Sequence, residues 1–270
     1  MPMKLNLIIG LLIVLLLGGA ALIGAAWTPY HPMQLDMLNR LAPPSFGHWL
    51  GTDEFGRDVL SRLMAGATTS IAIAVTTVLM AVSAGMIIGL VSGSVRGWTD
   101  RGLMAVTDAL LAFPGILLAL ALIVILGAGR TGIILALSLA YLPAVIRIVR
   151  SAVLSIREKE YVEASQVIGN SQAYTMFVHI LPNCLAPISV MATSMFGWVI
   201  LAESALSFLG LGVAPPAPTW GNMLSASQPY FERALWLSLA PGACIALALL
   251  ATNLIGDALR DRFDPRRLQA

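Results

Sequence analysis

Long apolar runs separated by short polar segments dominate the pattern of this chain. Six of the runs are long enough to cross a hydrocarbon core of roughly 30 Å as helices that rise about 1.5 Å per residue. A helix closes its backbone hydrogen bonds internally, as the bilayer interior requires. The pattern therefore predicts an all-α integral membrane protein with six transmembrane helices, at residues 5–26, 65–93, 103–127, 132–150, 185–209 and 234–255.

The first run could instead be a secretory signal peptide. Lys4 precedes it, and Gly24-Ala25-Ala26 resembles a cleavage site. The apolar core of a signal peptide is about 7–15 residues long, however, and the run from 5 to 26 is longer. We therefore expect this segment to stay in place as an uncleaved span.

Composition supports a membrane protein and excludes a soluble one. The chain of 270 residues is 58% hydrophobic and 11% charged, whereas soluble domains carry roughly 25% charged residues. That leaves too little polar surface to cover a soluble globule of this size. The net charge of +2 is too small to indicate a nucleic-acid partner.

The positions of Lys and Arg predict the orientation, because cytoplasmic loops are enriched in these residues. With both termini in the cytoplasm, most of them lie inside: Lys4, Arg96, Arg101, Arg147, Arg150, Arg157, Lys159, Arg260, Arg262, Arg266 and Arg267. The outside group is Arg40, Arg57, Arg62, Arg130 and Arg233. Segments 27–64 and 210–233 then face outward, and segment 155–182 faces the cytoplasm.

One membrane domain accounts for a chain of this length, and no internal repeat stands out. We expect residues 1–64 to form the first transmembrane helix and a periplasmic loop. Residues 65–270 are expected to form a core of five helices that carries the cytoplasmic segment at about 155–182.

The cytoplasmic segment predicts two short helices. Helical spacing places Tyr161, Ala164, Ser165 and Ile168 on one face of a helix over residues 160–168. The run Gly169-Asn170-Ser171 ends this helix, and Ser171 can cap a second helix that continues to about residue 179. Pro182 then begins the next span, where its missing N–H does no harm.

The first of these helices has features of a docking site. Small residues at Ala164 and Ser165 would let another protein surface approach closely, and Glu163 would offer that surface a carboxylate. An amphipathic linker that lies on the membrane is the alternative, and the pattern alone does not separate the two.

The same residues resemble the EAA motif of ABC importer permeases. Glu163-Ala164-Ser165, Gly169 and Leu181-Pro182 stand at the spacing of the motif. Ser165 replaces the second alanine, and His179 stands where many members have isoleucine. The string HILPN (179–183) is similar to the dipeptide/oligopeptide/nickel branch of the family. Four further strings resemble that branch: LGTDEFGRDVLSRL (50–63), LLAFP (110–114), LSFLGLGV…TWGNML (206–224) and NLIGDALRDRFDP (253–265).

This resemblance implies a permease of the type I importer fold in the bacterial inner membrane. It implies the C-type subunit of a permease heterodimer, partnered by two ATP-binding subunits and by a periplasmic or lipid-anchored solute-binding protein. The coupling loop would consist of Glu163, Ala164, Ser165, Gly169, His179, Leu181 and Pro182. Peptides are the preferred substrate class, and nickel or a nickel chelate is the alternative.

The chain is not expected to be an enzyme. It lacks the Walker A pattern GxxxxGK[ST], so ATP and magnesium would be used by the partner subunits. No catalytic residue, bound cofactor or metal site is expected. Asp53 and Glu54 together with His48 and His31 could be considered as metal ligands, but acids and histidines of a loop are usually solvated. Asp58 can cap the helix that follows.

Charges within spans indicate function by default. Glu203 admits a structural or a pathway role, whereas for Asp108 a structural role is favoured. Two tryptophans, Trp220 and Trp236, fit an aromatic belt at the membrane interface.

Two other classes of protein fit the sequence less well. An intramembrane serine protease would need a histidine within the bilayer, but His31, His48 and His179 all lie in loops. A stand-alone ion-coupled carrier often shows an inverted repeat around polar groups at the midplane, and only Glu203 meets the second condition.

Overall fold

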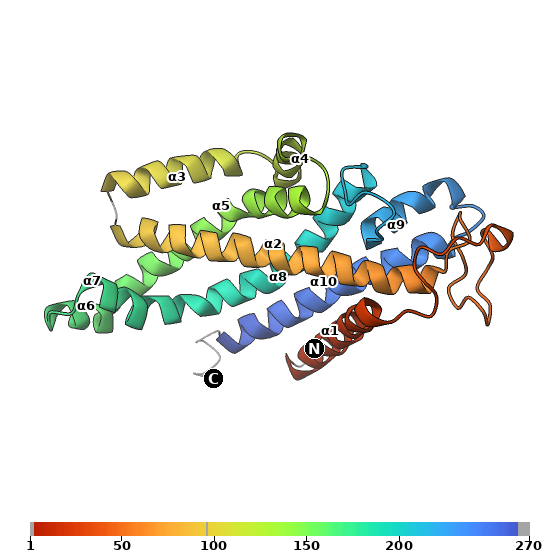
Figure 1. The fold of residues 1–270 in the computed structure, drawn as a ribbon. Coiled ribbons are helices and arrows are strands. Elements are labelled where there is room, and N and C mark those ends of the chain that lie inside the picture. The colour runs from red at the N-terminus through yellow and green to blue at the C-terminus, as the bar shows by residue number, and fades with distance from the viewer. Residues whose placement is uncertain (1–2, 96, 264–270) are drawn as a thin grey trace.

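The computed structural model describes residues 3–95 and 97–263, and within these it is helical, with one isolated β-bridge between Thr52 and Asp58 and no β-strand. Long helices lie side by side along one axis, with short helices at both ends (Figure 1). The helices are α1 (Met3–Ala26), α2 (Val59–Val95), α3 (Gly97–Leu111), α4 (Gly115–Leu126), α5 (Arg130–Arg157), α6 (Glu160–Val167), α7 (Gln172–Thr175), α8 (Leu181–Phe208), α9 (Trp220–Ser227) and α10 (Trp236–Phe263).

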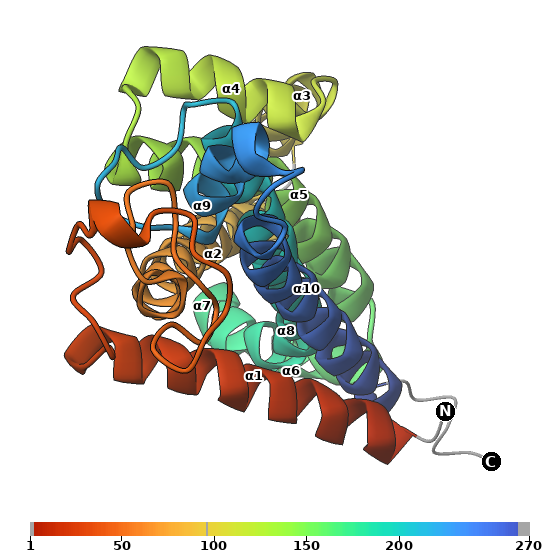
Figure 2. The same ribbon diagram turned by 90° about the vertical axis from the view of Figure 1, so that its right-hand side faces the viewer.

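Five helical segments of the described chain are long and apolar enough to cross a membrane: α1, α2, α5, α10, and the continuous stretch Gln172–Phe208 that contains α8. The first expected span coincides with Leu5–Ala26, and spans 65–93 and 132–150 lie within α2 and α5. Spans 185–209 and 234–255 match α8 and α10 to within two residues at the periplasmic end predicted for each. In Figure 2, α1 runs obliquely across α2 and α10. Gly10 of α1 packs against Ala251 and Ile255 of α10, so α1 is part of the bundle.

The third expected span, 103–127, is not one straight helix. The structure divides it into α3 and α4, which are bent by 95° relative to each other. The break contains Pro114, which precedes α4 and carries no N–H to continue the α3 hydrogen bonds. Proline also disfavours helical dihedral angles at the preceding residue, here Phe113. The expectation of six spans holds if this bent pair counts as one.

The helices α2 and α5 form the most extensive helix–helix contact of the described chain. Three glycines of α2 face three valines of α5 at matching four-residue intervals: Gly85 with Val145, Gly89 with Val149, and Gly93 with Val153. A β-carbon added at any of these glycines would lie 2.5 to 2.7 Å from a valine side-chain atom. All three valines are fully buried. Small residues thus let the two backbones approach, which is how helices associate in lipid.

Two Arg–Asp pairs attach α3 to α5. Arg150 donates to both carboxylate oxygens of Asp100, at 2.6 and 2.7 Å, and Ser92 of α2 donates to the same carboxylate. Arg147 forms an ion pair with Asp108, and both side chains are more than half exposed. Asp108 therefore has an ion-pair partner within this chain.

Two aspartates organise the loop between α1 and α2. Asp53 accepts from the backbone N–H of Phe55 and of Arg57 and from the Arg57 guanidinium. Asp58 accepts from the backbone N–H and the hydroxyl of Ser61, so it caps the start of α2 as the sequence predicts. Burial raises the pKa of the neighbouring Glu54 carboxyl above its ordinary value, because it penalises the charged form.

Trp220 does not belong to an interfacial belt, and that expectation is wrong. Its side chain is 1% exposed, its indole donates to the carbonyl of Leu63, and its backbone N–H donates to the hydroxyl of Ser70. Thr219 and Asn222 form a capping box that begins α9 at this point. The following helix turns back against α8 and α10, and so the tryptophan lies in the core.

We predict that Gly89→Ala destabilises the protein. The new β-carbon would lie 2.7 Å from the Val149 β-carbon and 2.9 Å from the Ile146 carbonyl oxygen, which belongs to the backbone. Overpacking of this kind typically costs about 1–3 kcal/mol. Thermal unfolding in detergent should show a lower transition temperature. The control is Gly18→Ala in α1, where an added β-carbon meets nothing within 4 Å. Equal stability of the two variants would contradict the close α2–α5 contact.

Candidate docking site at the α6 end

The helix α6 projects at one end of the bundle, beyond the ends of α2 and α5 (Figure 1, left). Glu160 and Glu163 lie in its first turn, where they stabilise the positive end of the helix dipole. Val162 and Ser165 are buried and hold α6 against the rest of the protein. Because one face of α6 is buried in this way, the opposite face is free to meet a partner.

A Schellman motif ends α6. The N–H of Asn170 donates to the carbonyl of Ser165, and the N–H of Gly169 donates to the carbonyl of Gln166. Gly169 has a φ of 95°, a conformation that residues with a β-carbon rarely adopt. The prediction that the helix ends at Gly169 is therefore confirmed, and the physical reason is this backbone conformation.

The exposed surface of α6 combines charge with apolar side chains. Glu163 and Ala164 are exposed, and so are Val167 (86%) and Ile168 (80%). Apolar side chains with this exposure at the tip of a projecting helix form a surface that a protein partner or a membrane can cover. We call Glu163, Ala164, Val167 and Ile168 the α6 surface.

Ser165 does not belong to this surface, and the expectation that it faces a partner is wrong. Its side chain is 4% exposed. The hydroxyl lies 3.1 Å from that of Thr175 and also accepts from the Asn170 amide. The small side chain at 165 thus permits a close contact inside the chain, between α6, the following turn and α7.

His179 is enclosed by two tyrosines. Its ring lies edge-on to Tyr161 of α6, with centroids 6.1 Å apart, and to Tyr174 of α7, at 5.9 Å. Both distances fall in the range of favourable edge-to-face contacts. The histidine therefore joins the two short helices to the start of α8.

The second short helix is not separate from the next span, contrary to the sequence-based expectation. Ser171 caps it as predicted, by accepting from the N–H of Tyr174. From Gln172, however, the chain is helical without interruption to Phe208. A π-helical turn, Met176–Ile180, precedes Leu181 and Pro182. Pro182 has no N–H for an ordinary helical bond and would clash with a carbonyl one turn back, and the wider turn relieves that conflict.

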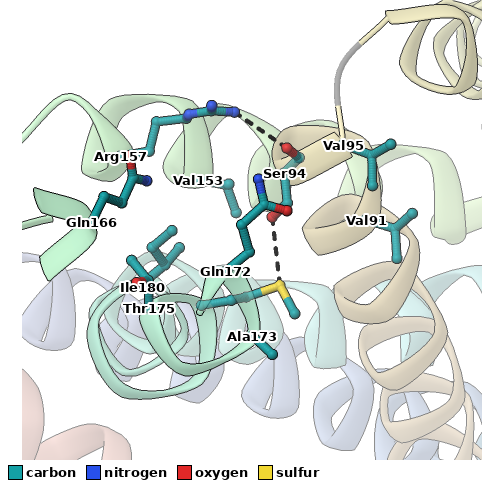
Figure 3. Close-up of a pocket in the computed structure, with 11 residues that line it drawn as sticks. Val91, Ser94, Val95, Val153, Arg157, Gln166, Gln172, Ala173, Thr175 and Ile180 are labelled. Atoms are coloured by element: carbon teal, nitrogen blue, oxygen red, sulfur yellow. Dashed lines mark hydrogen bonds between the residues drawn. The ribbon is translucent and has the colours of Figure 1, made fainter. Parts of the chain in front are cut away.

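A cavity of about 220 Å³ lies between α7 and the ends of α2 and α5 (Figure 3). Arg157 reaches across it and donates to the carbonyls of Gly93 and Ser94, which are among the last of α2. The Ser94 hydroxyl lies 3.5 Å from the sulfur of Met176. Arg157 is a residue whose structural role the sequence did not reveal. A cation that caps the free carbonyls at a helix end is favourable.

The two charged residues singled out within spans lie elsewhere. Asp108 belongs to α3 and pairs with α5. Glu203 lies near the end of α8 that is remote from α6, where it is 1% exposed. The structure therefore brings Glu163, Ala164, Gly169 and His179 together at one end, and it leaves Asp108 and Glu203 out of that group.

The arrangement of helices is shared with solved ABC importers. A structure of the inward-facing MetNI methionine ABC transporter matches with a TM-score of 0.62 and 18% identity, covering 75% of this chain and 97% of that one. An amino acid ABC transporter crystallised with histidines matches with a TM-score of 0.56 and 18% identity, covering 76% and 94%. These likenesses concern the fold.

The sequence places the chain within a family. Residues 85–269 match the model of the binding-protein-dependent transport system inner membrane component, and the chain belongs to this family. It is a multi-pass permease subunit of an ABC importer, and ATP hydrolysis resides on separate subunits of such systems.

Three similar proteins are named as permeases of peptide transport systems. The di/tripeptide transport system permease protein of Pseudomonas aeruginosa is 42% identical over 95% of this chain and 87% of its own. A putative peptide transport system permease protein of Brucella suis is 43% identical over 96% and 87%. The dipeptide transport system permease protein of Alkalihalophilus pseudofirmus is 41% identical over 96% and 85%.

We predict that Gly169→Ala weakens the turn after α6 without blocking membrane insertion. Nothing in the chain lies within 4 Å of the added β-carbon, so the penalty comes from the backbone conformation alone, at about 1–2 kcal/mol. Gly169→Asn should be milder, because asparagine tolerates a positive φ. Limited proteolysis of inserted protein should cut the 160–175 segment faster in the alanine variant. The reverse order of the two variants would contradict the assignment.

Proposed function

We propose that this chain is the C-type permease of an ATP-driven peptide importer in the bacterial inner membrane. It would pair with a second permease, and the two would enclose the route of the substrate. Two ATPase subunits would attach on the cytoplasmic side, and a periplasmic or lipid-anchored binding protein would deliver the peptide. The chain itself would hold no cofactor; ATP and magnesium would be used by the ATPase subunits.

The peptide assignment rests on the relatives and on how much of the chain they cover. Permeases named for peptide transport are 40–43% identical over 95–96% of this chain. The likeness thus includes both the cytoplasmic segment and the loop between α1 and α2.

The α6 surface is the proposed contact with an ATPase subunit. Val167 and Ile168 would enter an apolar cleft of the partner, and Glu163 would pair with a basic side chain at its edge. The buried Val162 and the internal bonds of Ser165 keep the helix in place without the partner. A preformed docking helix loses less conformational entropy on binding than a flexible loop would.

Two connections would carry motion from α6 into the membrane. The uninterrupted helix Gln172–Phe208 leads from the docking segment through the bundle. Arg157 ties the end of α5, next to α6, to the end of α2. Nucleotide binding to the ATPases can shift the conformation of the bundle only by binding one state more tightly, and these connections would transmit that preference.

We predict that Glu163→Lys prevents the ATPase subunits from co-purifying with the permease. The charge is reversed on an exposed side chain, so the chain should still insert and fold. Peptide uptake should fall by at least about tenfold, which corresponds to about 1.4 kcal/mol of lost binding energy. Glu232→Lys is the matched control, since Glu232 is exposed at the opposite end of the bundle.

Normal co-purification with Glu163→Lys would exclude a docking role for this carboxylate. A second variant, Ile168→Asp, then tests the apolar part of the α6 surface independently. If both variants retain the ATPase subunits, α6 is not the docking helix.

Substrate class is tested separately by transport. We expect a strain that lacks this chain to lose growth on di- and tripeptides as the sole source of a required amino acid, and to regain it when the chain is restored. Uptake of radioactive nickel should be unchanged. Loss of nickel uptake with peptide growth intact would replace the peptide assignment by a nickel one.

A further inference from the structure

The carboxyl group of Glu203 is buried near the end of α8 and only partly satisfied. Its side chain is 1% exposed. Oε1 accepts from the Ser207 hydroxyl at 2.8 Å. Oε2 and the hydroxyl of the adjacent Ser204 are buried, and neither has a hydrogen-bond partner within residues 3–95 and 97–263. Glu203 is therefore a buried acid with an unused oxygen.

No positive charge of the described chain compensates this acid. Its polar neighbour is the Ser207 hydroxyl, which donates to Oε1. None of the ion pairs among the described residues includes Glu203. Asp100 and Asp108 of α3 differ in this respect, since each pairs with an arginine of α5.

An isolated carboxylate is strongly disfavoured in an apolar interior, and such a group usually takes up a proton instead. A neutral carboxylic acid carries one O–H donor and keeps acceptor capacity. Glu203 in this form can keep the bond from Ser207 on Oε1 and carry its proton on Oε2, the oxygen that accepts no hydrogen bond from the described residues. The neutral form thus suits the surroundings better than the anion.

Glu203 lies in the part of α8 that contacts the start of α9. A β-carbon at Gly221 of α9 would lie 2.6 Å from the Ser204 α-carbon. At Gly212, in the connection from α8 to α9, it would lie 2.0 Å from the Ser207 hydroxyl. The two segments are therefore in close contact at Ser204, the residue after Glu203, and at Ser207, one turn further on, and the Glu203 side chain is shielded from solvent.

We propose that Glu203 is a proton-binding site whose neutral form positions α9 against α8. The charged form would require water in this contact and would separate α9 from α8. Because α9 also bonds to α2 through Trp220, the neutral acid keeps three helices together at the end of the bundle opposite α6. Glu203 is in this sense a positioning residue for transport, and that role rests on the proposed function.

Infrared spectroscopy of the reconstituted full-length chain tests the protonation directly. At neutral pH the wild-type protein should show the carbonyl stretch of a protonated carboxylic acid that is missing in Glu203→Gln. The control Glu232→Gln changes an exposed carboxyl and should leave that band intact. Absence of a difference between wild type and Glu203→Gln would overturn the proposal, whatever the substrate of the importer is.

Transport by the assembled complex tests the positioning role. Glutamine is neutral, has nearly the same shape and keeps an acceptor and a donor, so Glu203→Gln should retain uptake within roughly twofold. Alanine leaves a cavity and removes the acceptor of Ser207, so Glu203→Ala should lose about tenfold or more. Equal loss in both variants would show that the anion is needed, and no loss in either would show that the residue positions nothing; either result overturns the proposal. Failure of peptide uptake in the wild-type complex would contradict the proposed function instead, while the infrared result would stand.

Discussion

The close contact of α2 with α5 is the constraint on which the rest of the structure depends. Lipid surrounds the bundle, so burial of apolar surface gives no net attraction between helices, and dense packing must provide it. Gly85, Gly89 and Gly93 remove the side chains that would hold the two backbones apart. Once α2 and α5 are in place, Arg147 and Arg150 of α5 can reach the aspartates of α3. The position of α3 therefore follows from the α2–α5 contact.

The same contact supports the segment that contains α6 and α7. The helix α5 leads directly into α6, and Arg157 at the end of α5 donates to two carbonyls in the last turn of α2. The short helices are joined to each other by the hydroxyls of Ser165 and Thr175 and by the ring of His179 between two tyrosines. A force applied to α6 thus meets a connected structure rather than a flexible loop, as a subunit driven by an external ATPase requires.

The acidic side chains of this protein have three kinds of surroundings. In the loop between α1 and α2, Asp53 and Asp58 are satisfied by backbone N–H groups and by nearby side chains, and they shape an irregular segment. On α3, aspartates are paired with arginines. Glu203 accepts from the Ser207 hydroxyl and has no ion-pair partner among the described residues, so its neutral form is the one that the low-dielectric surroundings favour. These acids lie near or within spans, but some shape a loop, some attach one helix to another through an ion pair, and Glu203 is buried without one.

Hydropathy alone identified the segments that can cross a membrane. The mean hydropathy of about twenty residues depends on their composition and not on the helices that they contact. Local signals also sufficed at Asp58 and Gly169, since capping and a positive φ involve residues within a few positions. Tertiary structure decided the rest. The bend at Pro114, the burial of Trp220 and the inward side chain of Ser165 depend on which helices meet, and the bond from Arg157 to α2 joins residues 64 positions apart. The periodicity of residues along one helix predicts which of them share a face, but the neighbouring helices determine whether that face is buried.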